Sequence, residues 1–273
     1  MTASPGSIVV STGYKAQAEL LRLTPAGVFA DARIEPWRTL ADRQNCTLRF
    51  EAAGRSHLWH VKRYLGSRAV RAMLAEVNGY QHLIAASIPT LDLVAHGTLD
   101  DRRAFTITAD LTGYLAGDKY IASAAGGFDQ ILQPTARLAA RLHAAAPAGA
   151  SLHHRDLYLC HFFIHQHKPS DVRLIDVARV RPLPRLFRQR WIVKDLAQFL
   201  YSTYDPDLGP ADITDLQRRA WLAEYAAAAD TPLSNSLHHR IYQKVQRIAR
   251  HDAHLREDQP MRNISIPPHN GTA

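Results

Sequence analysis

The chain has 273 residues, 46% of them hydrophobic, and this composition excludes a fibrous or wholly disordered protein. Its formal net charge of +8 suits anionic partners or serves solubility alone, and the charge does not decide between them. Its two cysteines, Cys46 and Cys160, are too few for a disulfide framework and favour a reducing compartment. The first residues lack the pattern of a signal peptide, and no stretch reaches the roughly 18 apolar residues of a membrane span, so we expect a soluble cytoplasmic protein.

The first part of the chain is predicted to be mostly strands. An N-terminal extension over residues 1–30, in which no element is predicted, precedes an N-lobe over residues 31–112. Residues 33–64 are predicted to form three strands, and alternation of apolar and polar residues makes the second and third of them a β-hairpin. A helix capped by Ser67 and two more strands follow. From the hairpin onward, these elements cover residues 47–51, 58–64, 70–84, 91–96 and 104–108 in chain order.

Helices dominate the second part, so we expect a helical C-lobe over residues 113–259 and a disordered tail over residues 260–273. The first helix is placed at residues 134–146, because proline is tolerated in the first turn of a helix and Pro134 would stand there. A small hairpin and three further helices follow. They are expected over residues 162–164 and 172–177 for the hairpin, and 191–204, 211–229 and 236–257 for the helices.

The sharpest motif is LHHRDLYLCHF, which begins at Leu152 and contains the triplet His154-Arg155-Asp156. Asp176 follows it in the string LIDV. This order is typical of the catalytic loop and metal-binding aspartate of protein-kinase-like enzymes. Phosphoryl transfer needs one carboxylate at the acceptor hydroxyl and a second at the metal that bridges the phosphates of ATP. We therefore predict an α+β, bilobal, protein-kinase-like fold, with a β-rich N-lobe, a helical C-lobe and ATP between them.

Two further positions agree with a kinase fold. Lys62 lies on the third predicted strand and Glu76 on the helix after it, which is the arrangement of the pair that grips the α- and β-phosphates. A lysine at this place, taken alone, is more often a solvated strand end. Asp195 follows Lys194 at the start of an apolar helix, where kinase folds carry an aspartate that anchors the catalytic loop. A helix N-cap is the simpler interpretation of Asp195, and both interpretations are structural.

The strings HRDLYLCHF and KDLAQFLYS resemble the bacterial lipopolysaccharide kinase (Kdo/WaaP) family, and the likeness runs over about residues 30–258. The family motif H-R-D-x-Y-x-x-H-F is matched by His154, Arg155, Asp156, Tyr158, His161 and Phe162. The resemblance implies an ATP-dependent kinase of a heptose or Kdo sugar in the lipopolysaccharide inner core. It implies Asp156 as catalytic base, with His154 and Arg155 in its loop, Asp176 as the Mg²⁺ ligand, and Lys62 and Glu76 at the nucleotide.

His161 stands where protein kinases carry asparagine. Because Mg²⁺ prefers oxygen ligands, the imidazole is either a poorer second ligand of the metal and nucleotide or a group that orients the Asp156 loop. The sequence also departs from kinases in having no G-x-G-x-x-G motif. The expected first turn, over residues 40–46, reads LADRQNC, so backbone amides approach phosphate less closely there.

Other functions remain open. A small-molecule kinase of the aminoglycoside or choline type usually carries H-G-D with asparagine five residues later, so Arg155 and His161 count against it. A pseudokinase that acts as a binding module would explain the missing glycines. The histidines between His153 and His167 match no zinc pattern, and no base-reading motif supports nucleic-acid binding.

The basic charge fits an anionic glycolipid acceptor. The last predicted helix has Arg240, Lys244, Arg247 and Arg250 opposite an apolar face. Such a helix either lies on an anionic membrane or packs on the core with a solvated basic face. The expected partners are thus ATP and the lipopolysaccharide core, with a peripheral contact to the inner membrane as a further hypothesis and no nucleic acid.

Overall fold

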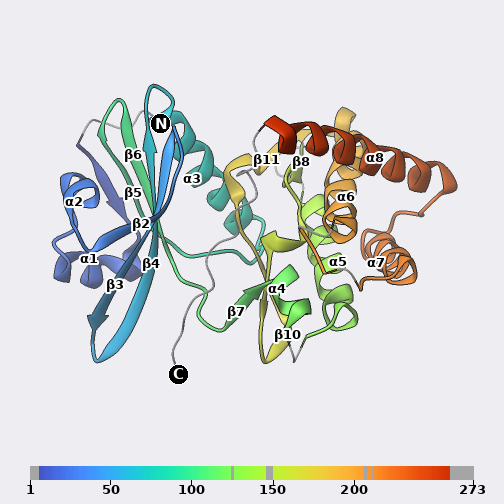
Figure 1. Cartoon of the computed structure of the whole chain (residues 1–273), viewed down its shortest axis with the longest axis horizontal. Helices are drawn as coiled ribbons and strands as arrows, with labels where there is room; N and C mark the ends of the chain where they lie inside the picture. Colours follow the sequence, from blue (N-terminus) through green and yellow to red (C-terminus); the bar gives the residue numbers. More distant parts are fainter. Residues whose placement is uncertain (1–5, 124–125, 146–149, 206–207, 211, 259–273) are drawn as a thin grey trace. The chain divides into compact units, whose positions relative to one another are not determined.

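The computed structural model describes residues 6–123, 126–145, 150–205, 208–210 and 212–258. The chain forms two compact units (Figure 1). The first comprises Met1–Thr112 and Leu174–Arg181, and the second comprises Gly113–Arg173 and Pro182–Ala273. The segment that carries Asp176 therefore belongs to the first unit. The tail expected at residues 260–273 lies outside the described residues.

The first unit is built on a six-stranded antiparallel sheet with the strand order β1-β5-β6-β4-β3-β2. The predicted hairpin is confirmed as β3 and β4, joined at Ala53 and Gly54, whose φ angles of 51° and 69° suit a tight hairpin turn. The strands are β1 (Ile8–Val10), β2 (Ile34–Thr39), β3 (Arg43–Ala52), β4 (Arg55–Leu65), β5 (Leu93–Asp100) and β6 (Arg103–Ala109).

Residues 8–30 contain elements that the sequence analysis did not predict. Strand β1 pairs with β5, and the short helices η1 (Thr12–Tyr14), α1 (Lys15–Leu20) and α2 (Pro25–Ala30) follow it. Thr24 caps α2 by accepting a hydrogen bond from the Gly27 amide at 3.0 Å. Val28 of α2 is buried in a core cluster with Val61 and Phe105 of the sheet. Elements of three to six residues are too short to show a period in the sequence.

Helix α3 (Ala69–Ala85) packs on the sheet through Met73 and Val77, which are buried with Tyr64 and Ala104. Its other important neighbour is the short helix η4 (Val177–Arg179), which follows Asp176. Gly79 makes this contact possible, because a Cβ atom at that position would lie 2.0 Å from the carbonyl oxygen of Val177. Helix α3 thus supports the segment that carries Asp176.

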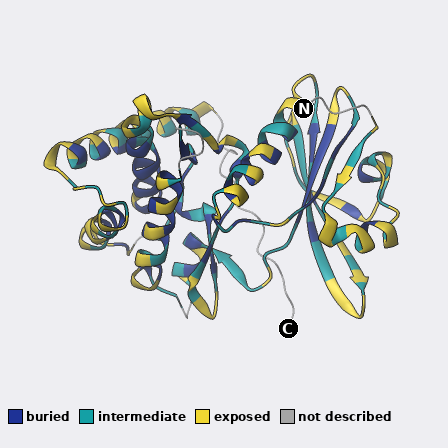
Figure 2. Cartoon of the chain, turned by 180° about the vertical axis from the view of Figure 1, so that it is seen from behind, coloured by how far each residue is buried: buried dark blue, intermediate teal, exposed yellow. Residues whose placement is uncertain are grey.

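The second unit is mostly helical. Helices α5 (Phe128–Ala144) and α6 (Arg188–Tyr204) are largely buried, as Figure 2 shows. Phe199 of α6 stacks on Trp221 of α7 (Asp215–Ala228) with ring centroids 3.8 Å apart, and α8 (Asn235–Asp258) packs on α6. The remaining elements are β7 (Tyr114–Ala116), α4 (Gly117–Ala122), β8 (Ala150–His153), η3 (Leu159–His161), β9 (Phe162–His165), β10 (Lys168–Leu174), β11 (Arg181–Pro184) and η5 (Arg185–Phe187).

The predicted start of the helix at Pro134 is wrong. Helix α5 begins six residues earlier, at Phe128, and Pro134 lies inside it. Phe128 and Ile131 are buried in the first turns, and this burial offsets the cost of a proline in the helix interior, about 3 kcal/mol. Within the part of the chain that the structure describes, no helix is both long and apolar enough to cross a membrane.

Candidate active site

Lys62, Glu76 and Asp176 come together within the first unit, from β4, from α3 and from the segment before η4. The Lys62 ammonium nitrogen lies 2.9 Å from Glu76 Oε1 and 3.9 Å from Asp176 Oδ1. Glu76 is buried, with 2% of its side chain exposed, whereas Asp176 is 45% exposed. The lysine is therefore fixed between one buried carboxylate and one that faces solvent.

Glu76 is held by more than the lysine. It accepts hydrogen bonds from the hydroxyl groups of Tyr64 and Tyr80, the second at 3.4 Å. Burial and the Glu76 charge raise the pKa of both tyrosines well above the ordinary value, so they act as donors. Burial alone would lower the pKa of Lys62, but the charges of Glu76 and Asp176 outweigh it, and the pKa is raised. The cluster therefore keeps Lys62 protonated.

Asp176 has a left-handed backbone conformation, with φ 56° and ψ 56°. Aspartate tolerates this region better than most residues, but at some energetic cost, so the surrounding contacts must hold it. On one side Thr90 Oγ1 donates to the Leu174 carbonyl at 2.6 Å, and on the other Gly79 admits Val177 against α3. These contacts fix where the Asp176 carboxylate lies.

Asp195 organises the loop that carries Asp156 within the second unit. Its side chain is fully buried and accepts hydrogen bonds from the His154 amide at 2.9 Å and the Arg155 amide at 2.8 Å. His143 Nε2 lies 3.2 Å from the same carboxylate. Burial opposes ionisation, but the His143 hydrogen bond and the charges of the neighbouring histidines together outweigh it, and the pKa of Asp195 is lowered. The N-cap interpretation of Asp195 is wrong, because α6 begins at Arg188, about two turns earlier.

Arg155 also has a left-handed backbone, with φ 69°. Lys194 Nζ donates to its carbonyl oxygen, and its guanidinium lies 5.0 Å from the centroid of the Trp191 ring. These contacts, together with the hydrogen bond that the Arg155 amide donates to Asp195, hold a backbone conformation that an arginine seldom adopts. The geometry therefore gives Arg155 an organising part in the loop.

The carboxylate of Asp156 is oriented by Gln198, whose Nε2 donates to Oδ1 at 3.1 Å. His161 Nδ1 lies 2.7 Å from the Asp156 carbonyl oxygen, which can only accept, so Nδ1 carries the proton. The His161 ring also stacks on His154, with ring centroids 5.7 Å apart. The structure thus joins His154, Asp156 and His161 in one hydrogen-bonded and stacked loop.

The sequence analysis missed three residues that support this loop, namely His143, Trp191 and Gln198. Gln198 follows Asp195 by one helical turn, so the rule that residues three apart share a helix face could have found it. His143 and Trp191 reach the loop from α5 and from the first turn of α6, and no spacing in the sequence indicates these contacts.

His143, His153 and Asp195 are buried and offer ligand atoms within 4.8 Å of one another. The two carboxylate oxygens of Asp195, however, already accept the amides of the catalytic loop. Burial, together with the neighbouring His143 charge, lowers the pKa of His153 to about 3, so this ring stays neutral. We interpret the cluster as the anchor of the loop.

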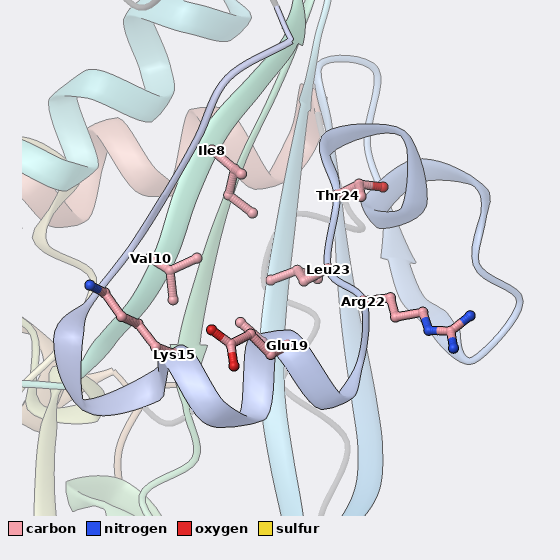
Figure 3. A pocket seen from close by; sticks show the side chains of 8 residues that line it. Ile8, Val10, Lys15, Glu19, Arg22, Leu23 and Thr24 are labelled. Atoms are coloured by element: carbon pink, nitrogen blue, oxygen red, sulfur yellow. The ribbon is translucent and has the colours of Figure 1, made fainter.

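A shallow groove lies elsewhere in the first unit, where β1, α1 and the turn after α1 meet (Figure 3). Its volume is about 560 Å³, and it is lined by Ile8, Val10, Leu23, Lys15, Glu19, Arg22, Ala18 and Thr24. None of the predicted site residues lines it.

The model of the lipopolysaccharide kinase (Kdo/WaaP) family matches residues 43–219, well over half of the chain. The chain belongs to this family. Two similar relatives are each named lipopolysaccharide core heptose(I) kinase WaaP, from Escherichia coli and its strain K12. They are 30% identical over 205 residues and 29% identical over 202 residues, and each alignment covers 66% of this chain and 74% of the relative.

A solved structure shows the fold. The crystal structure of aminoglycoside-3′-phosphotransferase of type VIII superposes with a TM-score of 0.53 and 19% identity, over 77% of this chain and 91% of that one. The predicted α+β protein-kinase-like fold and the predicted family are both confirmed. This lipopolysaccharide kinase is a phosphotransferase, and its phosphate donor is ATP. The roles of individual site residues stay predictions.

Proposed function

We propose that the chain transfers the γ-phosphate of ATP to a hydroxyl group of a heptose in the lipopolysaccharide inner core. A Kdo sugar is the alternative acceptor within the same family. The observation that carries the proposal is the 30% identity to a lipopolysaccharide core heptose(I) kinase, over an alignment that includes 66% of the chain. The hydrogen-bonded loop around Asp156 supports it, because this chemistry needs a carboxylate at the acceptor hydroxyl.

Asp156 is the catalytic base in this proposal. Gln198 fixes its carboxylate with an uncharged amide, so the carboxylate keeps its capacity to accept the hydroxyl proton of the sugar. His154 and Arg155 act through the backbone amides that Asp195 holds. Their part is to position Asp156.

Lys62 and Asp176 suit the phosphates and the metal. A protonated lysine held by a buried glutamate can pair with phosphate oxygens without moving. Asp176 offers the carboxylate oxygens that Mg²⁺ prefers, so the residues present fit this ion. When bound, Mg²⁺ neutralises charge on the phosphates of ATP.

His161 is assigned to the orientation of the loop. Its Nδ1–H group donates a hydrogen bond to the Asp156 carbonyl oxygen. In the neutral tautomer that this bond selects, the lone pair lies on Nε2. A nitrogen ligand is a poor match for Mg²⁺, whereas the bond to the Asp156 backbone acts directly on the catalytic loop. The interpretation of His161 as a second metal or nucleotide ligand is therefore the less favoured one.

Direct phosphate transfer tests the proposed function. The protein is incubated with γ-labelled ATP, Mg²⁺ and either a heptosylated core or Kdo-lipid A, beside the variant Asp156→Ala. We expect label in the heptosylated core, and its loss in the variant, while nucleotide binding persists. Label in Kdo-lipid A would move the assignment to the alternative sugar. ATP binding without transfer to either acceptor would contradict the proposal and favour a binding module.

We further propose that the second unit contacts an anionic membrane surface, since a glycolipid acceptor is presented there. Helix α8 buries Leu237, Ile241 and Val245, which favours a core-packed helix with a solvated basic face. The better candidate is η5, where Leu186 is 86% and Phe187 50% exposed. Exposed arginines precede and follow this apolar pair, an arrangement that suits lipid phosphates around an inserted apolar tip.

A further inference from the structure

One row of polar side chains crosses three strands of the first unit. In the antiparallel register, Arg38 of β2 lies opposite Asn45 of β3, and Asn45 lies opposite Lys62 of β4. A β-bulge between Pro36 and Arg38 shifts the register of β2 and brings Arg38 to this position. Opposite residues of an antiparallel sheet share a face, so Arg38, Asn45 and Lys62 lie on the same side.

Arg43 extends this row along β3. It stands two residues before Asn45 and therefore on the same face, opposite Tyr64. The other face carries the apolar core, with Cys46 opposite Val61. Neighbouring strands are about 4.8 Å apart, so the Cα atoms of Arg38 and Lys62 are separated by about 10 Å, which two long side chains can span together. Three cationic side chains thus converge on the polar face.

A buried donor in this row indicates that the face is built for a ligand. Arg43 Nε is buried, and this donor has no hydrogen-bond partner among the residues that the structure describes. Asn45 can assist only through the N–H groups of its side-chain amide, because its Oδ1 accepts hydrogen bonds, as a phosphate oxygen does. Buried polar atoms are rarely left without a partner. The Glu76 carboxylate accepts hydrogen bonds from Lys62, Tyr64 and Tyr80, and not from Arg43 Nε.

The positive charges of these side chains also indicate a ligand. Burial and the charge of Arg43 lower the pKa of Arg38, and the charge of Arg43 opposes protonation of Lys62. Like charges therefore lie close enough to repel one another, and an anion with several negative charges would relieve the repulsion. Arginine offers a planar fork of N–H donors that matches phosphate oxygens. The ligand chemistry indicated is a chain of phosphates.

The turn between β2 and β3 explains why side chains are needed here. It contains Leu40 and Asp42 but no glycine, so its backbone amides cannot approach a phosphate as closely as a glycine-rich loop does. We propose that Arg43, assisted by Arg38 and Asn45, binds the phosphates of the nucleotide beside Lys62 and replaces the glycine-rich loop. This inference rests on the proposed function in one respect, namely that ATP is the phosphate donor.

Nucleotide affinity tests the proposal directly, by calorimetric titration with Mg·ATP, Mg·ADP and AMP. A hydrogen bond to a charged group is worth about 1.5–3 kcal/mol, so Arg43→Ala is expected to weaken ATP and ADP binding about tenfold to a hundredfold. AMP binding should change less than threefold, and this also shows that the variant is folded. Arg43→Lys keeps the positive charge but lacks the planar guanidinium. Its affinity for ATP and ADP should lie between that of Arg43→Ala and that of the parent protein.

Arg49 provides the matched control. It lies on the same strand and the same face as Arg43 but six residues away, about 20 Å along the strand, and it is exposed. Arg49→Ala should leave all three affinities unchanged. Unchanged ATP affinity in Arg43→Ala, or an equal loss in Arg49→Ala, would overturn the proposal. Normal binding by the parent protein without transfer to lipopolysaccharide would instead count against the proposed function alone, since the binding comparison would still stand.

Discussion

Replacing Gly79 by alanine should displace the segment that carries Asp176. In a helix interior this change ordinarily stabilises by about 1 kcal/mol, because alanine has the higher helix propensity. At Gly79 the new Cβ atom would lie 2.0 Å from the Val177 carbonyl oxygen and 2.8 Å from its carbonyl carbon, both backbone atoms. Helix α3 and η4 must then separate by about 1 Å, and overpacking of this kind costs about 1–3 kcal/mol. Set against the gain in helix propensity, this leaves an expected net loss of stability of about 0–2 kcal/mol.

Activity should fall further than stability. Asp176 precedes Val177 directly, and a misplacement of about 1 Å at a catalytic group can lower the rate about a hundredfold. Urea unfolding and ATP-dependent transfer are measured on Gly79→Ala beside Gly13→Ala, whose new Cβ atom meets nothing within 4 Å. The control should behave as the parent protein. A Gly79→Ala protein with parental activity and higher stability would refute the packing argument.

Three further predictions concern the second unit. Asp195→Ala leaves two loop amides and His143 without their buried acceptor. Urea unfolding should therefore show a free energy of unfolding that is lower by about 3–5 kcal/mol. A decrease below about 1 kcal/mol would contradict the anchor role. His153 has a folded-state pKa of about 3, below its unfolded value near 6.5, so between these values only the unfolded chain takes up the proton. Stability therefore falls as the pH is lowered from about 6.5 to about 3, by up to about 1.4 kcal/mol per pH unit. Unfolding curves of His153→Leu should show a shallower fall than the parent over the same pH range, and an identical slope would contradict the assignment. Replacing both Leu186 and Phe187 by serine should abolish sedimentation of the protein with vesicles rich in anionic phospholipid. The control Leu216→Ser should not, because this leucine, 77% exposed, is preceded by the acidic Asp215. Sedimentation of the double variant at the parental level, or self-association through this pair without vesicle binding, would contradict a membrane contact.

The sequence was sufficient wherever a period or a fixed motif carried the information. The alternation in β3 and β4 predicted their hairpin, and the loop motif predicted the fold and the family. The boundaries were less predictable, because local rules compete with tertiary burial. Proline rules placed the start of α5 at Pro134, whereas the buried side chains of Phe128 and Ile131 extend the helix beyond it.

The supporting residues of the site could not be predicted, since contacts between distant elements leave no spacing in the sequence. Arg155 illustrates this. Its left-handed backbone depends on Asp195, Lys194 and Trp191, all about 40 positions away. A motif names the residue that does the chemistry, but the energy that holds it in an unfavourable conformation comes from a helix that the motif does not include.

The absence of a glycine-rich loop has a similar explanation. Judged by sequence, residues 40–46 lack what a kinase needs at the phosphates, and this favoured a pseudokinase as an alternative. The register of the sheet places Arg38, Arg43 and Asn45 on the face that carries Lys62, which the linear order of these residues does not reveal. A backbone that cannot approach the phosphates closely leaves space that longer side chains can fill. In our proposal the arginines therefore neutralise the negative charge of the phosphates, which a glycine-rich loop would otherwise do with its backbone amides.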